Sequence, residues 1–151
     1  MGREFICGKE EPVVETAAGK LRGFRYGTTY HFFGIKYAEC RRWQQPEPVK
    51  AWKGIKDALS YGYIAYPGTP DTPVGDLLIP HRFWPKSEDC LNLNIWTQSI
   101  TGGVKKPVMV WIHGGGYAAG SAIEMVAYDG KNLSEFGDIV LVSVNHRLNA
   151  L

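Results

Sequence analysis

The chain has 151 residues, of which 44% are hydrophobic and 13% aromatic, and its formal charge of +2 is nearly balanced. This composition favours a packed domain, or part of one, over a disordered protein. Lysine and arginine are scattered along the chain, which argues against a nucleic-acid partner or an anionic membrane surface. No apolar run approaches the ~20 residues of a membrane helix, and the first residues do not resemble a secretory signal.

The first forty residues favour antiparallel β structure. Residues 13–16 and 21–26 predict strands joined by a turn at 18–20, with Gly23 interrupting the second strand. Residues 28–35 are rich in β-branched and aromatic side chains, which suits a third strand.

The next segment is different. Residues 46–85 carry most of the prolines of the chain and show little periodicity. We expect a long irregular segment with one short helical piece near residues 55–61. An irregular segment of this length usually has a function or covers a site as a lid.

The rest of the chain predicts a sheet with a buried core. Residues 91–96 alternate apolar and polar side chains, as in a strand with one buried face. Residues 107–112 and 139–144 are nearly all apolar, as in strands of a parallel sheet buried on both faces. Between them, residues 131–136 predict a short helix that ends with Gly137 in the left-handed conformation. Strand, crossover and strand indicate a right-handed βαβ unit.

The most informative motif is His-Gly-Gly-Gly at residues 113–116, directly after a predicted strand. Three successive residues without a Cβ leave backbone N–H groups that another group can approach closely. Such N–H groups can stabilise the negative oxygen formed during acyl transfer. A glycine-rich turn without a catalytic role is an alternative. A dinucleotide-binding loop is a weaker one, because the strands and prolines before the motif do not suit a first Rossmann strand.

Two acidic residues, Glu88 and Asp89, lead into the predicted strand 91–96. Adjacent residues on a strand point to opposite faces, so a structural role is favoured over joint acid–base catalysis. We expect Glu88 to pair with Arg147 and Asp89 to accept backbone hydrogen bonds. Breaking a buried arginine–carboxylate pair costs several kcal/mol, so the predicted pair would stabilise the fold.

Taken together, these motifs resemble those of the type-B carboxylesterase family, which includes the cholinesterases. The resemblance covers residues 12–151 and leaves residues 1–11 as an N-terminal extension. It implies an α/β fold, the incomplete N-terminal portion of an α/β-hydrolase, in which antiparallel strands lead into a central mixed, mostly parallel sheet. The matching segments are residues 33–38, 42–46, 88–94, 113–117 and 144–148.

Members of this family cleave carboxylic esters with a serine–acid–histidine triad and without a cofactor or metal. The resemblance implies that the N–H groups of Gly115 and Gly116 are oxyanion-hole donors and that Glu88 and Arg147 form a structural salt bridge. The 151 residues end before a Gly-x-Ser-x-Gly nucleophile motif, so we expect the chain alone to be inactive towards a small-molecule ester. Two alternatives are a non-catalytic cholinesterase-like interaction protein and one chain of a split esterase, completed by a separate C-terminal chain.

Three positions depart from the family pattern. Lys36 stands where proline is frequent, and His146 stands where an aromatic residue is usual. Secreted members pair the cysteine matching Cys90 with an upstream cysteine, but residues 63–66 contain none. With Cys7 and Cys40 also outside any disulfide or metal-binding pattern, we expect a reduced, cytoplasmic protein.

Overall fold

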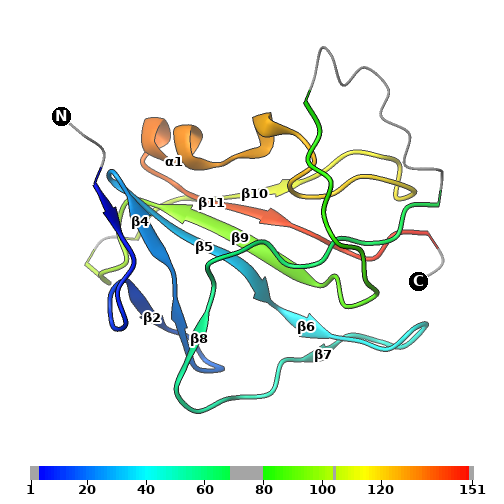
Figure 1. Cartoon of the computed structure of the whole chain (residues 1–151), viewed down its shortest axis with the longest axis horizontal. Helices are drawn as coiled ribbons and strands as arrows, with labels where there is room; N and C mark the ends of the chain where they lie inside the picture. Colours follow the sequence, from blue (N-terminus) through cyan, green and yellow to red (C-terminus); the bar gives the residue numbers. More distant parts are fainter. Residues whose placement is uncertain (1–3, 69–79, 104, 150–151) are drawn as a thin grey trace.

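The computed structural model describes residues 4–68, 80–103 and 105–149. Its central element is a six-stranded sheet in the order β1-β4-β5-β9-β11-β10 (Figure 1). The only parallel neighbours in this described sheet are β10 and β11, and the other pairs are antiparallel. The strands are β1 (Phe5–Ile6), β4 (Phe24–Tyr26), β5 (Thr29–Lys36), β9 (Asn92–Thr97), β11 (Val140–Val144) and β10 (Val108–Ile112).

The predicted parallel pair of apolar strands is therefore confirmed. A mostly parallel sheet is not what the described residues form, since the sheet is mixed and mainly antiparallel. A parallel pair needs a long crossover segment, and the segment between β10 and β11 is the one such crossover that joins neighbouring strands of this sheet.

Two smaller sheets accompany the central one. The first joins β2 (Val13–Glu15), β3 (Lys20–Arg22) and β8 (Ile55–Asp57), and the second joins β6 (Ala38–Glu39) to β7 (Glu47–Pro48). The helical piece predicted near residues 55–61 is wrong, because its first residues form β8. The parallel pairing of β8 with β3 places Arg22 beside Asp57, and two hydrogen bonds of 2.7 and 2.9 Å join their side chains.

The helix and the three-stranded sheet lie on opposite sides of the central strands (Figure 1). Helix α1 (Lys131–Gly137) contacts β5, β9 and β11. The core on the helix side is formed by Phe33, Trp96 and Leu141. The core on the other side is formed by Leu21, Phe32 and Ala58.

Helix α1 confirms the predicted helix to within one residue, but its C-terminus differs from the prediction. Asp138, with φ 48°, adopts the left-handed conformation that was expected at Gly137, and its N–H donates to the Ser134 carbonyl. Aspartate tolerates this conformation better than most residues, and the Asp138 carboxylate also pairs with Lys106. In the described ranges, no helix is long and apolar enough to cross a bilayer.

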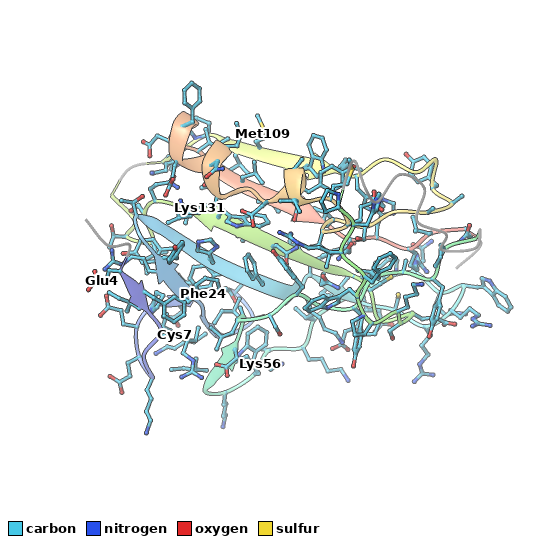
Figure 2. All side chains as sticks on the ribbon, turned by 45° about the horizontal axis from the view of Figure 1, so that its top comes forward. Glu4, Cys7, Phe24, Lys56, Met109 and Lys131 are labelled. Carbon is cyan, nitrogen blue, oxygen red and sulfur yellow. The ribbon has the colours of Figure 1, made fainter. Side chains whose placement is uncertain are left out.

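Strand β10 differs most from its expected burial. All five residues are exposed, from 40% at Trp111 to 65% at Ile112, although we predicted a strand buried on both faces. Figure 2 shows Met109 of this strand at the outer margin of the sheet. β10 is an edge strand of the described sheet, and α1 covers β5, β9 and β11 instead.

His31 is a buried histidine on the helix side of the sheet. It is 5% exposed and stacks on Phe24 with ring centroids 4.5 Å apart. Neither ring nitrogen has a hydrogen-bond partner among the described residues. Burial, only partly offset by the carboxylates of Asp129 and Glu135, lowers the pKa of His31 to about 4.

Acid is therefore expected to weaken the fold through His31. The unfolded chain binds a proton on this ring near pH 6.5 and the folded chain only near pH 4, so the free energy of unfolding falls as the pH is lowered through that window. The expected loss between pH 8 and pH 5 is about 1–2 kcal/mol, and His31→Phe removes it. Urea unfolding of both proteins at the two pH values checks this. An equal loss in the variant would show that His31 is not responsible.

Candidate active site

The glycine-rich loop, residues 113–120, follows the last residue of β10. Gly115, Gly116 and Gly120 have φ angles of 115°, 61° and 100°, which disfavour any residue with a Cβ. A Cβ on Gly115 would also overlap the carbonyl oxygen of Ala119, whereas open space surrounds the corresponding position of Gly116. The backbone therefore favours glycine at these three positions, most strictly at Gly115.

The carbonyl groups of the loop are used to hold its shape. The Gly115 carbonyl accepts hydrogen bonds from the N–H groups of Ala118 and Ala119, at 3.0 and 3.1 Å. The Tyr117 carbonyl accepts a hydrogen bond of 2.8 Å from the N–H of Asn149, beyond β11. The loop is therefore a closed turn attached to the segment that follows the neighbouring strand.

The N–H groups of Gly115 and Gly116 are not used in this way. Neither donates a hydrogen bond to an acceptor within residues 4–68, 80–103 or 105–149, and both glycines are exposed. Adjacent backbone N–H groups held in a turn can bind an anionic oxygen. This is the chemistry that the sequence predicts for these two residues.

Histidines lie at the entrance of the loop. The buried ring of His113 stacks on that of His146, with centroids 4.7 Å apart and an interplanar angle of 5°. Nδ1 of His113 is 2.8 Å from the Gly114 carbonyl, which can only accept, so the ring donates here. Burial lowers the pKa of His113, the hydrogen bond to Gly114 opposes that change, and the nearby His146 reinforces it.

A pair of buried asparagines supports the other end of the loop. Oδ1 of Asn145 accepts a hydrogen bond of 2.8 Å from the N–H of Ala122. Nδ2 of Asn145 donates to Oδ1 of Asn92 at 3.1 Å, and the Asn145 N–H donates to the Asn92 carbonyl at 2.9 Å. The Tyr37 hydroxyl donates to the Asn145 carbonyl at 2.9 Å. These contacts join the chain after the loop to β9 and to the end of β11.

Sequence reasoning missed these asparagines. The alternation in residues 91–96 predicted one buried face, which the apolar residues were expected to supply. In the structure, Asn92 and Asn94 are 2% and 0% exposed and are more buried than their neighbours Leu93 and Ile95. Asparagine recurs at alternate positions of this segment. That pattern suits a buried row of polar side chains and a solvent-exposed face equally well, so the sequence alone did not reveal the buried pair.

Glu88 and Arg147 are not paired with each other in the structure. Glu88 pairs with Arg42, at a largely exposed position, and the hydrogen bond from Arg42 lowers the pKa of Glu88. Arg147 instead donates to the Gln44 carbonyl at 2.9 Å. The predicted Glu88–Arg147 pair does not form, because Arg42 pairs with Glu88 and the Gln44 carbonyl accepts the hydrogen bond of Arg147.

The departures from the family pattern at Lys36 and around Cys90 also have local explanations. Asp89 pairs with Lys36 at 2.7 Å, so the residue found in place of proline supplies an ion-pair partner. Cys90 is fully buried against Ala65 and Leu148, and burial raises the pKa of its thiol to about 11. Ala65 thus occupies the position facing Cys90 within residues 63–66, and Cys90 is a free thiol.

The described ranges contain no cluster of three histidine, cysteine or acidic residues that could hold a metal ion.

Comparison with known families agrees with these motifs. The model of the carboxylesterase family matches residues 10–151. A phenmedipham hydrolase of Pseudarthrobacter oxydans is 40% identical over 93% of this chain and 29% of its own length. Acetylcholinesterase-1 of Trittame loki is 38% identical over 92% of this chain and 26% of its own length.

Solved structures give the same result. An esterase from the anaerobe Clostridium hathewayi, described as hydrolysing aliphatic aromatic polyesters, superposes with a TM-score of 0.93 and 55% identity. The match covers 98% of this chain and 29% of that one. A carboxylesterase of Geobacillus stearothermophilus superposes with a TM-score of 0.74 and 36% identity, over 91% of this chain and 26% of its own. The chain therefore spans less than a third of the length of these relatives.

Proposed function

This chain belongs to the carboxylesterase family, and from that premise we propose that it is the N-terminal part of a serine esterase whose oxyanion hole is formed by the N–H groups of Gly115 and Gly116. The observation that carries the proposal is the pair of exposed N–H groups without a described protein acceptor, at the end of a strand and in a turn closed by its own carbonyls. An oxyanion hole requires such donors.

The proposed chemistry follows the charge that develops on the substrate. As a nucleophile attacks the ester carbonyl, negative charge moves onto its oxygen, and hydrogen bonds from fixed N–H groups strengthen at that moment. The donors need not move, because the Gly115 carbonyl already holds the turn through Ala118 and Ala119. The nucleophile, acid and base are proposed to lie outside the 151 residues, which contain no Gly-x-Ser-x-Gly.

We infer the substrate class from the same relatives. The family model is that of carboxylesterases, and a carboxylesterase is among the solved structures, so we propose a small-molecule carboxylic ester as the substrate, with no cofactor. If the activity is divided between two chains, the complementing chain supplies the triad. The buried thiol of Cys90 facing Ala65, where secreted members are expected to have a disulfide, supports a cytoplasmic location.

A chimera tests this function. Residues 10–151 replace the matching N-terminal part of the Clostridium hathewayi esterase, which is 55% identical to this chain. We expect the chimera to hydrolyse a p-nitrophenyl ester with saturation kinetics, and the 151-residue chain alone to give no hydrolysis above background. A chimera that melts cooperatively but is inactive, beside an active parent, would contradict the proposal. Saturable hydrolysis by the chain alone would contradict the proposed location of the nucleophile.

A further inference from the structure

Tyr117 directly follows the proposed oxyanion donors and has an unusual backbone conformation. Its φ angle is 60°, in the left-handed region that glycine adopts freely and that asparagine and aspartate tolerate. The conformation is unfavourable for a tyrosine, because its Cβ comes too close to the following carbonyl oxygen. Trp43, Asp138 and Asn149 are the other non-glycine residues of the described ranges with a positive φ.

Hydrogen bonds on both sides of Tyr117 hold this conformation in place. The Tyr117 carbonyl accepts from the Asn149 N–H at 2.8 Å. The next residue, Ala118, donates to the Gly115 carbonyl at 3.0 Å, and its own carbonyl accepts from the Gly68 N–H at 2.7 Å. The turn therefore imposes a left-handed backbone on the residue at position 117.

The ring of Tyr117 gains little from the described part of the fold. It is 77% exposed, and its one ring neighbour among the described residues is His146, at a centroid distance of 5.9 Å and an interplanar angle of 54°. Glycine or asparagine would suit the turn better, and burial does not compensate for the aromatic side chain. Residues that break a local rule in this way are concentrated at functional sites.

The ring lies at the end of the sheet where the glycine loop emerges. His146 follows β11, and the register pairs the last residue of β10 with the last residue of β11, so the contact with His146 places the ring beside the carboxyl ends of both strands. Successive Cα atoms are about 3.8 Å apart, so the tyrosine side chain starts one residue from Gly116. A group attached to an ester carbonyl held by the Gly116 N–H is within reach of such a ring.

We propose that Tyr117 is a specificity-determining residue whose ring packs against an aromatic group of the substrate, on the acyl or the alcohol side of the ester bond. This rests on the function proposed above and narrows the substrate class to esters that carry such a group. A rigid, exposed ring offers a flat group a large apolar contact at a small cost in side-chain ordering.

Two pairs of esters measure this role in the chimera. p-Nitrophenyl benzoate and p-nitrophenyl acetate differ in the acyl group, and benzyl acetate and ethyl acetate differ in the alcohol. Tyr117→Asn removes the ring and keeps a residue that tolerates the left-handed backbone. We expect it to lower kcat/KM for the aromatic member of one pair by about tenfold relative to the small member. Because both members use the same N–H groups, damage to the oxyanion hole lowers both rates and leaves their ratio unchanged.

Two further variants separate the ring from other effects. Tyr117→Phe keeps the ring and is expected to keep the ratios of the parent. Trp43→Asn is the matched control, since Trp43 is 74% exposed with φ 59° but lies outside the glycine loop, with Arg42 5.8 Å from its ring centroid. It is expected to leave both ratios unchanged. The Tyr117→Asn chimera is also expected to melt at no lower temperature than its parent, since strain is relieved and no cavity is opened.

The role of Tyr117 is refuted if neither ratio changes in Tyr117→Asn, or if Trp43→Asn changes them equally. A lower melting temperature of Tyr117→Asn would also refute it, because the ring would then be packed against the rest of the esterase and not free for the substrate. An active chimera with unchanged ratios refutes this role alone. A folded chimera that is inactive towards all four esters refutes the proposed function, and the role of Tyr117 with it.

Discussion

Replacing Gly115 with alanine is expected to lower kcat of the chimeric esterase by about 10²–10³-fold, the usual effect of losing one oxyanion donor. Gly115 has φ 115°, and a Cβ there would overlap the Ala119 carbonyl oxygen, so the loop must shift to accept it. Because the N–H group moves with the backbone, the loss should appear in kcat with little change in KM. Steady-state kinetics on a p-nitrophenyl ester measure both constants.

The matched control is Gly114→Ala, one residue earlier in the same loop. Gly114 has no left-handed φ angle, and no atom lies within 4 Å of the position that its Cβ would take. We expect it to lower kcat by less than about tenfold, since the donors are left in place. Equal losses of kcat in the two variants would show that any added side chain in the loop lowers activity. The placement of the Gly115 N–H group would then not be the cause. Near-normal activity of Gly115→Ala would remove Gly115 from the oxyanion hole.

The second large effect is expected at Asn145. Asn145→Ala leaves two buried groups without partners, the N–H of Ala122 and Oδ1 of Asn92. Each unsatisfied buried group costs roughly 1–3 kcal/mol, so the free energy of unfolding should fall by about 2–5 kcal/mol. Urea unfolding of the chimera and of its variant measures the difference.

Asn149→Gly provides the comparison for this loss, since Asn149 has a φ angle of 60° that glycine adopts without strain and alanine does not. Asn149 is exposed, and its side chain makes a similar hydrogen bond to the backbone, from Nδ2 to the Tyr66 carbonyl at 3.1 Å. Water replaces that bond when the side chain is removed, so a change of less than about 1 kcal/mol is expected. Equal free energies of unfolding for the two variants would show that the buried amide network of Asn145 does not stabilise the loop.

Much of the sheet could be predicted from local sequence. The apolar β-branched runs at residues 107–112 and 139–144 give β10 and β11, since short apolar runs of that length are typical of strands, although β10 is exposed and not buried as predicted. Residues 55–61 were predicted as a helical piece, but the strand conformation of residues 55–57 depends on pairing with β3, which lies 35 residues earlier in the chain. Asp138 takes the left-handed position that was expected at Gly137, and its carboxylate also pairs with Lys106.

The candidate site was predictable in part. The backbone requirement for glycine at Gly115 and Gly116 is encoded in the motif itself, and their role as oxyanion donors stays a prediction. The partner of Glu88 could not be derived, because charge alone does not distinguish Arg42 from Arg147. The contact of His146 with His113 depends on the register of two parallel strands, which the sequence does not give.

The most direct measurement is a crystal structure of the chimera with a boronic-acid or phosphonate transition-state analogue bound to its nucleophile. The oxygen that stands in for the oxyanion is expected to lie about 2.7–3.1 Å from the backbone nitrogens of both Gly115 and Gly116. An analogue whose oxygen is held by other donors, with these two N–H groups turned towards protein carbonyls, would contradict it.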